Sequence, residues 1–323
     1  MSKTLIEVKD LTKYFDTPKG KLHAVEKVNL KIGEGETLGV VGESGCGKTT
    51  LGRTMTRLVE PTGGEVLLNG KNILNLQGKA KNEIYQSIQM VFQDPYSSLN
   101  PRLSVGNIIE DPLKTMGAKI SKGELHHKVL ELMEIVGLQS RYYNTYPHEL
   151  DGGRRQRVGL ARALALDPKF IVCDEPVSAL DVSIQAQILN LLMDLQEDKH
   201  LSYMFITHNL FVVKHISDYI IVMYMGQVVE YASKKELFEH PVHPYTKALL
   251  DVIPQPDLSR RNLKKKILRG EVSSPINPKP GCRFAPRCPY ATKQCTSGEI
   301  PLVEIGTDHL CACILYNSKE YEV

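Results

Sequence analysis

Long apolar runs are missing from this sequence of 323 residues. No stretch approaches the roughly 18 apolar residues that cross a bilayer, so a membrane-spanning chain is excluded. The first ten residues carry Lys3, Glu7, Lys9 and Asp10, where a secretory signal needs an apolar stretch. These absences predict a protein of the cytoplasm. The length predicts about two domains, and the hydrophobic content of 42% is ordinary for a chain with a sizeable core.

A strong charge of one sign is missing too, because 40 basic and 37 acidic residues leave a net charge of +3. That balance, without any motif that joins aromatic and basic residues, predicts no nucleic acid as a partner. Basic residues do cluster before the proline-rich run Pro275 to Pro280, at Arg260, Arg261, Lys264, Lys265, Lys266 and Arg269. We interpret this stretch as a solvated linker, with contact to anionic lipid as the alternative.

The most informative segment that is present runs from Gly42 to Thr49 and reads GESGCGKT. It matches the phosphate-binding P-loop, G-x-x-x-x-G-K-[ST], and lies between a strand-like run and a helix-like run. The glycines let the backbone wrap round a polyphosphate, Lys48 reaches the β- and γ-phosphate oxygens, and the Thr49 hydroxyl binds Mg²⁺. The predicted ATP-binding residues here are Gly42, Glu43, Ser44, Gly45, Cys46, Gly47, Lys48, Thr49 and Thr50.

The remaining chain alternates between strand-like and helix-like runs. The first 70 residues are β-rich, and residues 93–150 form an insertion of amphipathic helices. Strands then alternate with helices, which predicts an α/β fold with a parallel sheet. The expected strands are Ile6 to Val8, Ala24 to Ile32, Thr37 to Val41, Glu65 to Leu68, Ile88 to Phe92, Phe170 to Cys173 and Tyr203 to Ile206. The expected helices are Arg155 to Leu166, Ser183 to Gln196 and one opened by Ser233, after a hairpin around Gly226.

One apolar strand ends in two carboxylates. Residues 170–175 read FIVCDE, which is the form of a Walker B segment. A buried parallel strand of this kind delivers Asp174 to the Mg²⁺ shell and Glu175 to the attacking water. We therefore predict that Glu175 is the general base of hydrolysis.

The motifs occur in a characteristic order. They are the P-loop, Gln93 at the end of a strand, the segment LDGGRRQ at residues 150–156, the Walker B strand, Asp181 and His208. With this set the chain resembles the ATP-binding cassette (ABC) ATPases from Leu5 to about Gly226. The resemblance implies a P-loop NTPase cassette at residues 1–233, with a RecA-like parallel-sheet core, an antiparallel β layer, and a helical subdomain at about 94–155.

The resemblance also implies roles for single residues. Gln93 contacts Mg²⁺ and the attacking water while facing a membrane partner, and His208 contacts the γ-phosphate. Asp181 lies in a loop that crosses the interface between two cassettes. The implied Mg²⁺ ligands are Thr49, Asp174 and Gln93. The signature loop, which reaches ATP bound to the partner cassette, consists of Asp151, Gly152, Gly153 and Arg154.

Two residues of the signature loop depart from the family pattern, which has Ser at the position of Asp151 and commonly Gln at that of Arg154. One interpretation is that Asp151 simply caps the following helix, as Ser would. The other is that its carboxylate repels the γ-phosphate of the partner site, with Arg154 offsetting the repulsion only in part. The second interpretation predicts a heterodimer with a similar ATPase whose own signature loop is standard.

Adenine recognition in this family uses an aromatic residue about 30 residues before the P-loop. Tyr14 and Phe15 are both candidates, and neighbouring residues of a strand point to opposite faces, so only one can stack on the base. Alignment of residues 11–13 with the family pattern favours Phe15, and Tyr14 remains the alternative.

Two further segments resemble the branch of the family that imports peptides and nickel. They are DPYSSLNP at residues 94–101 and HPVHPYT at residues 240–246. A metal site at His240 and His243 is disfavoured, because paired His-Pro steps are typical of turns.

The branch implies an ATPase that energises import of dipeptides or oligopeptides. Its partners would be a second ATPase subunit and two membrane permeases, with an extracytoplasmic peptide-binding protein acting indirectly. The protein would be a peripheral subunit on the cytoplasmic face of the membrane. Import of nickel or oligosaccharides remains open, and the alternative from another class is a soluble ABC ATPase without a transport role.

Cysteines are scarce before residue 281 and concentrated after it, which predicts a small C-terminal module within residues 234–323. Cys282, Cys288 and Cys295 form a C-x₅-C-x₆-C pattern without the C-x₂-C knuckles of common zinc ribbons. The tail resembles that of oligopeptide transporter ATPases, which implies a [4Fe-4S] cluster with Cys313, or alternatively Cys311, as fourth ligand. Zinc, or no metal, remains open.

Overall fold

The computed structural model describes residues 3–117, 120–251 and 274–317, so the basic stretch from Arg260 to Arg269 lies outside the described residues. The chain divides into two compact units. The first comprises Met1–Ile6, Ile32–Thr37 and Leu67–Ile206, and the second comprises Glu7–Lys31, Leu38–Val66 and Thr207–Val323.

The first unit contains a parallel sheet in which three strands are neighbours in the order β6, β7, β8. Their bounds are Ile88–Val91, Phe170–Asp174 and Ser202–Ile206. All side chains of β7 and β8 are buried, as expected for parallel strands that are covered on both faces. The apolar run that ends in Asp174 therefore forms the predicted buried strand.

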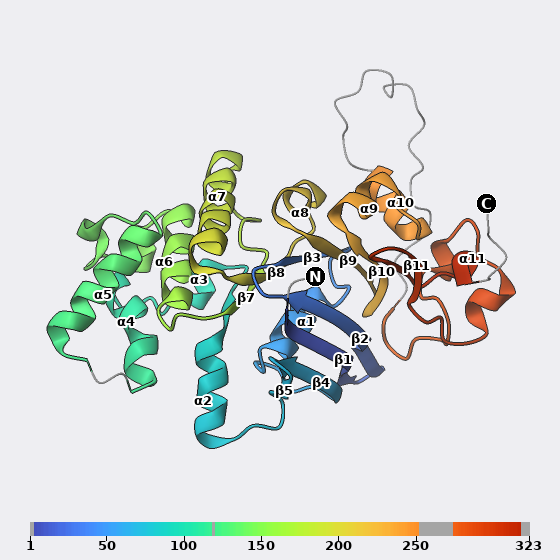
Figure 1. Cartoon of the computed structure of the whole chain (residues 1–323), viewed down its shortest axis with the longest axis horizontal. Helices are drawn as coiled ribbons and strands as arrows, with labels where there is room; N and C mark the ends of the chain where they lie inside the picture. The colour runs from blue at the N-terminus through green and yellow to red at the C-terminus, as the bar shows by residue number, and fades with distance from the viewer. Residues whose placement is uncertain (1–2, 118–119, 252–273, 318–323) are drawn as a thin grey trace, which may run out of the picture. The chain divides into compact units, whose positions relative to one another are not determined.

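Helices form most of the rest of the first unit, and α4, α5 and α6 pack against one another (Figure 1). The α5 helix begins with a complete capping box, in which Ser121 and Glu124 satisfy each other's backbone N–H groups. Amphipathic helices are thus present where the sequence predicts them. The helices are α2 (Gly78–Ser87), α3 (Pro95–Ser98), α4 (Val105–Thr115), α5 (Lys122–Ile135), α6 (Gly152–Leu164) and α7 (Val182–Lys199), with short turns η1 (Ser140–Tyr142) and η2 (Pro147–Glu149) and the strand β5 (Lys71–Asn72).

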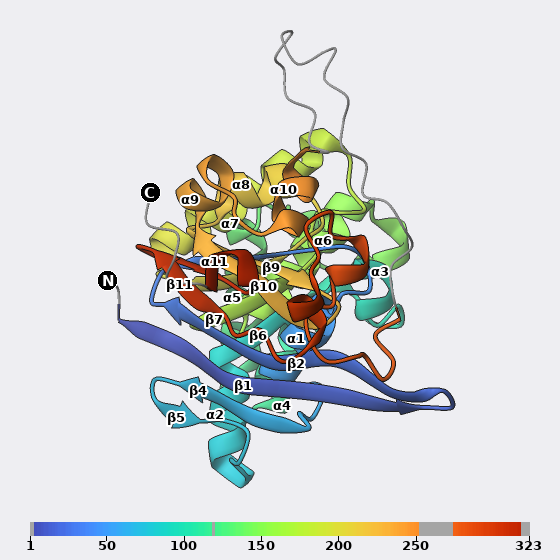
Figure 2. The same cartoon turned by 90° about the vertical axis from the view of Figure 1, so that its right-hand side faces the viewer.

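The second unit contains strands of two sheets. In one, β1 (Thr4–Thr17) and β2 (Gly20–Gly33) lie side by side as a long hairpin, visible in Figure 2, and β4 (Gly63–Leu68) is the other neighbour of β1. In the other, five strands have the order β11, β12, β10, β9, β3. Their bounds are β3 (Thr37–Val41), β9 (Tyr219–Tyr224), β10 (Gln227–Ser233), β11 (Val303–Gly306) and β12 (His309–Cys311).

The C-terminal residues continue this second sheet. β3 pairs parallel to β9, β9 forms an antiparallel hairpin with β10, and β12 pairs antiparallel to β10. The tail therefore extends the sheet that contains the P-loop strand, whereas the sequence predicted a separate C-terminal module. The helices of this unit are α1 (Lys48–Met55), α8 (Leu210–Ile216), α9 (Lys234–Glu239), α10 (Pro244–Asp251) and α11 (Ile314–Asn317), with short turns η4 (Ala285–Arg287) and η5 (Lys293–Thr296).

Element boundaries differ from the sequence prediction where hydrogen bonds with other segments extend an element. The strands β1 and β2 are longer than predicted because they pair along most of their length, beyond the apolar positions. Ser233 caps α9 by accepting from the backbone N–H of Glu236, at 3.3 Å, as predicted. Among the described residues, every helix is too short or too polar to cross a bilayer.

Candidate functional site

The P-loop of the second unit connects β3 to α1 and has a backbone that only glycine allows at two positions. Gly47 has φ = 104°, and a Cβ there would lie 2.0 Å from the carbonyl oxygen of Ala24. A Cβ on Gly42 would lie 2.2 Å from the carbonyl oxygen of Met223. The loop is thus packed against β2 and β9 so closely that a side chain at either position would displace backbone.

Lys48 is the first residue of α1 and is 5% exposed. Its Nζ donates to the carbonyl oxygens of Gly42, at 2.9 Å, and of Glu43, at 3.0 Å. The ammonium group therefore lies within the curve of the loop, where loop N–H groups and the positive end of α1 favour an anion. Burial raises the pKa of the Cys46 thiol beside it, so this thiol is neutral.

The first unit brings Gln93 and Glu175 together. The Nε2 of Gln93 donates to Oε2 of Glu175 at 2.9 Å. Glu175 follows β7 directly and has φ = 45°, a left-handed conformation that is unusual outside glycine and is found at functional sites. Its backbone N–H donates to the carbonyl oxygen of Ile206 at 2.9 Å, which continues the pairing of β7 with β8. Asp174, one residue earlier, is 1% exposed.

The α6 helix holds the segment that follows Gln93. Arg162 donates to the carbonyl oxygen of Ser98 at 2.6 Å, and the guanidinium of Arg155 lies 4.9 Å from the ring centroid of Tyr96. Asp94 caps α3 by accepting from the backbone N–H of Tyr96 at 2.8 Å. The position of Gln93 is therefore coupled to α6, the helix that begins in the signature loop.

Asp151 is the N-cap residue of α6. Its Oδ1 accepts from the backbone N–H of Arg154 at 2.8 Å, and its Oδ2 accepts from Nη1 of Arg154 at 2.6 Å. Asp151 therefore caps the helix, as the first interpretation predicts, and Arg154 neutralises part of its charge. The pair is about half exposed, so water screens the attraction.

Two other predicted residues lie at helix starts. Asp181 is exposed and precedes α7, and its carbonyl oxygen accepts from the backbone N–H of Gln185 at 2.8 Å. His208 belongs to the second unit and is exposed in the loop before α8, next to Asn209, whose side chain caps that helix.

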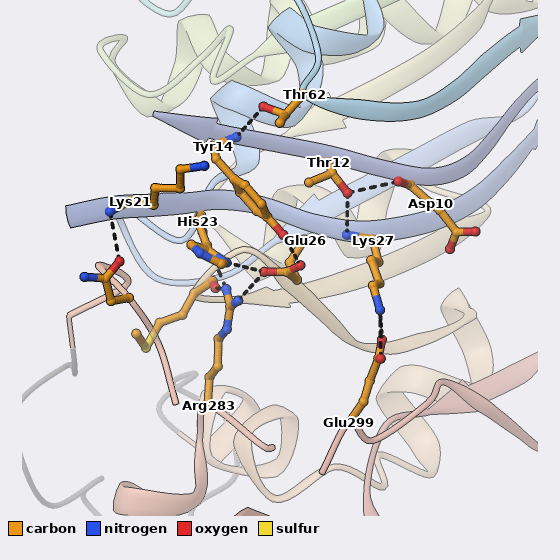
Figure 3. Close-up of polar contacts among 12 residues, drawn as sticks. Asp10, Thr12, Tyr14, Lys21, His23, Glu26, Lys27, Thr62, Arg283 and Glu299 are labelled. Carbon is orange, nitrogen blue, oxygen red and sulfur yellow. Dashed lines mark hydrogen bonds and ion pairs between the residues drawn. The ribbon is translucent and has the colours of Figure 1, made fainter. Parts of the chain in front are cut away.

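The structure distinguishes the two candidate aromatic residues of β1. The ring of Tyr14 stacks on His23 with centroids 4.0 Å apart, and its hydroxyl donates to Glu26 (Figure 3). Burial and the bond to Glu26 raise the pKa of Tyr14 to about 12. Phe15 is 36% exposed, with Nζ of Lys13 4.7 Å from its ring centroid. The ring of Phe15 is therefore the one with surface available to a base.

Sequence reasoning missed a group of residues that contact the P-loop from distant parts of the chain. Arg287 pairs with the Glu43 carboxylate through Nη1, at 2.8 Å, and Nη2, at 3.1 Å. The hydroxyl of Tyr245 accepts from the backbone N–H of Glu43 at 2.9 Å. Both contacts join residues more than 200 positions apart, and no local pattern signals such a pairing.

The predicted iron–sulfur site is contradicted by the side-chain geometry. All seven cysteines are described and are free thiols, yet no group of three or more His, Cys, Asp or Glu side chains among the described residues is arranged to hold a metal ion. The [4Fe-4S] prediction for Cys282, Cys288, Cys295 and Cys313 is therefore wrong, and the zinc alternative fails with it.

Burial of the cysteines disfavours the thiolate form that a metal ion requires. It raises the pKa of Cys282 to about 11 and raises the pKa of Cys288 and Cys313, which favours the thiol over the thiolate that binds metal. With Cys295, these side chains line one narrow apolar cavity beside Phe284 and Leu315. Cys311, the alternative ligand, is fully buried in β12. The cysteines thus behave as small apolar residues in a core.

Of the two histidines in the HPVHPYT segment, His240 is exposed and His243 is buried. His243 is 1% exposed, and its Nδ1 accepts from the backbone N–H of Tyr245 at 3.1 Å. The backbone N–H of His243 donates to Oε2 of Glu230 at 2.9 Å. Burial lowers the pKa of His243 to about 4, so the ring is neutral. Glu230 also accepts from Nε2 of His309 at 2.8 Å. His243 therefore holds α10 and Tyr245 in place.

Comparison with family models finds two matches along the chain. Residues 25–178 match the family described as ABC transporter. Residues 229–295 match the family described as oligopeptide/dipeptide transporter, C-terminal region.

Two curated relatives match almost end to end. The chain is 49% identical over 322 residues to the oligopeptide transport ATP-binding protein OppF of Salmonella typhimurium, covering 97% of this chain and 96% of the relative. It is 48% identical over 318 residues to the dipeptide transport ATP-binding protein DppF of Haemophilus influenzae, covering 96% of each.

A solved structure supports the fold. It is a dimeric ATP-binding cassette in a post-hydrolysis state, bound to ADP and phosphate, with 31% identity and a TM-score of 0.66. The similarity covers 71% of this chain and 99% of that chain.

Proposed function

Because the chain belongs to the ABC transporter family, we propose that it is the ATP-binding and hydrolysing subunit that energises an importer of dipeptides and oligopeptides. The similarity of residues 229–295 to the C-terminal region of oligopeptide and dipeptide transporters carries the substrate assignment. A buried lysine in the P-loop and the paired Gln93 and Glu175 support the hydrolytic role.

The nucleotide roles follow from the chemistry of each side chain. The residues of the P-loop, 42–50, bind the phosphates, and Phe15 stacks on adenine, because Tyr14 is engaged by His23 and Glu26. Glu175 accepts a proton from the attacking water, Gln93 orients Glu175 and that water, and His208 donates to the γ-phosphate. Thr49, Asp174 and Gln93 offer the oxygen ligands that suit Mg²⁺, which offsets phosphate charge when bound.

The chain has a modular organisation in this proposal. Residues 1–233 form the ATPase domain with a helical subdomain at about 94–155, and residues 234–323 form the C-terminal region of peptide importers. Two membrane permeases and a second ATPase subunit complete the transporter, which receives peptides from an extracytoplasmic binding protein. The chain is then peripheral on the cytoplasmic face of the membrane.

Loss of this chain should abolish import of labelled dipeptides and tripeptides by the cell. The reason is that the permeases cannot be driven without closure and hydrolysis at the cassettes. Uptake is measured in a deletion strain carrying either the intact chain or an empty vector, with uptake of a free amino acid as the control. Normal peptide uptake combined with loss of nickel or oligosaccharide uptake would assign the chain to another substrate branch.

We also propose that the chain works in a heterodimer whose two ATP sites are unequal. Asp151 would lie opposite the γ-phosphate bound by the partner subunit, where its charge is repulsive. Arg154 offsets only part of that charge, because their ion pair is about half exposed. The site built on Lys48 and Glu175, completed by the partner's signature loop, would be the more active one.

Blocking the two catalytic glutamates separately in the assembled transporter should reveal the inequality. Glu175→Gln should remove most of the hydrolysis, and the equivalent change in the partner subunit should remove little. Asp151→Ser should then raise hydrolysis at the partner's site severalfold. The asymmetric proposal fails if Glu175→Gln leaves most hydrolysis intact, or if this chain alone forms a fully active homodimer.

A further inference from the structure

The carboxylate, the backbone N–H and the carbonyl oxygen of the P-loop residue Glu43 each bond to another side chain. Arg287 forms a two-pronged ion pair with its carboxylate, the Tyr245 hydroxyl accepts from its backbone N–H, and Lys48 donates to its carbonyl oxygen. Two of these three partners, Arg287 and Tyr245, come from the C-terminal part of the chain. The Arg287 side chain is 7% exposed and that of Glu43 is 27% exposed, so the pair is screened less than a surface ion pair.

Buried aromatic residues fix the two partners of Glu43. The ring centroid of Phe284 lies 5.3 Å from that of Tyr224 and 5.3 Å from that of Tyr245, and all three residues are at most 1% exposed. Nη1 of Arg287 also donates to the hydroxyl of Tyr224 at 3.3 Å. Tyr224 and Glu43 together therefore fix the position of the guanidinium, and a group fixed in this way lowers the entropy cost of ordering the loop that it contacts.

A second arginine, four residues earlier, is linked to the loop indirectly. Arg283 donates to the carbonyl oxygen of Met225 and pairs with Glu26 at 2.6 Å, as Figure 3 shows for Glu26. The next residue after Met225, Gly226, donates its backbone N–H to the carbonyl oxygen of Cys46 at 2.7 Å. Arg283 is thus linked to the P-loop residue Cys46 through the Met225–Gly226 turn.

The same arginine also fixes the hairpin that carries the aromatic candidates. Glu26, its partner on β2, accepts from the hydroxyl of Tyr14 and contacts Nδ1 of His23, on which Tyr14 stacks (Figure 3). This network keeps Tyr14 engaged and leaves Phe15, the next residue, as the exposed ring. The C-terminal residues therefore contact both the phosphate-binding loop and the hairpin of Phe15.

We propose that Arg287 and Arg283 are positioning residues that fix the P-loop and the β1–β2 hairpin, so that the C-terminal region sets the affinity of this chain for ATP. Arg287 acts directly on Glu43, and Arg283 acts through the Met225–Gly226 turn. Neither arginine has a role in the nucleotide chemistry proposed above. The inference rests on that proposed ATP site.

Arg287→Met tests the direct contact with Glu43, because the substitution keeps the length of the side chain and removes its charge and hydrogen bonds. In the full-length chain, the Kd for a fluorescent ATP analogue should rise about 10-fold, the effect of losing a charged hydrogen bond. In the assembled transporter, KM for ATP should rise by a similar factor while kcat at saturating ATP changes less than about threefold. Arg287→Lys should give an intermediate Kd, since an ammonium keeps the charge but loses the two-pronged geometry.

A double-mutant cycle distinguishes this contact from a general loss of stability. Glu43→Gln should raise the Kd by about the same factor, and Glu43→Gln combined with Arg287→Met should raise it no further. Arg283→Met should raise it by a smaller factor, about threefold, because its contact with the loop is indirect. Thermal unfolding of each variant shows whether binding changes independently of stability.

The chain offers a matched control. Lys27 and Glu299 also join β2 to the C-terminal region, at 2.8 Å (Figure 3), but both side chains are more than half exposed and neither residue belongs to the P-loop. Glu299→Gln should leave the Kd unchanged within about twofold, as expected for an exposed ion pair.

Two results would overturn the inference. One is a Kd within twofold of the unchanged chain for both Arg287→Met and Glu43→Gln, and the other is additive effects in the double variant. Lys48→Ala separates this failure from failure of the ATP site itself. If Lys48→Ala abolishes binding while the arginine variants bind normally, the P-loop proposal holds and the role of the arginines does not.

Discussion

Glu175→Gln should leave ATP binding intact and lower hydrolysis at the site of this chain by about 10²- to 10⁴-fold, the usual contribution of a general base. The amide has nearly the same shape as the carboxylate, so the backbone after β7 and its bond to Ile206 should persist. What is lost is the group that accepts the proton of the attacking water. Binding is measured with a fluorescent ATP analogue and turnover by phosphate release from the assembled transporter.

Glu197→Gln is the matched control for this experiment. Glu197 lies on α7 in the same unit, is exposed, and has no role in the proposed chemistry. The control should hydrolyse ATP at the unchanged rate. Steady hydrolysis by the Glu175→Gln transporter at the same rate as this control would show that another residue is the base.

Lys48→Ala should raise the Kd for ATP by about 100-fold or more, because several charge-assisted hydrogen bonds to the β- and γ-phosphates are lost together. The residue also donates to two loop carbonyl oxygens, those of Gly42 and Glu43, so the loop loses internal support as well. Direct titration of the full-length chain with the analogue measures the effect. Hydrolysis should fall in proportion at low ATP concentration.

Lys128→Ala serves as the control. Lys128 is an exposed residue of α5, and its substitution by alanine removes the same charge from the chain as Lys48→Ala does. Its Kd should match that of the unchanged protein, so that net charge alone cannot account for the loss. Tight binding by Lys48→Ala would mean that nucleotide binds elsewhere, and both the P-loop assignment and the inference built on it would fall.

Local patterns determined much of this protein. The glycines of the P-loop, the buried β7 and the caps at Asp151 and Ser233 are all specified by neighbouring residues, because conformation, strand burial and capping depend on short segments. The order of these motifs along the chain was sufficient to predict the cassette fold.

Long-range contacts were decided only by the tertiary structure. The sequence left Tyr14 and Phe15 as alternatives, and the stacking of Tyr14 on His23 leaves Phe15 exposed. The spacing of the cysteines and the resemblance of the tail predicted a metal cluster, yet metal binding requires ligand geometry and the thiolate form, and a sequence pattern fixes neither.

The ion pair between Arg287 and Glu43 is the clearest example of a contact that the sequence does not predict. The two residues are 244 positions apart, so no periodicity or turn signal connects them. Their contact follows from the pairing of β9, β10 and β12, which brings the C-terminal part of the chain to the sheet that contains the P-loop strand. The sequence by itself predicted which residues bind phosphate, and the packing of distant strands decided what holds those residues in position.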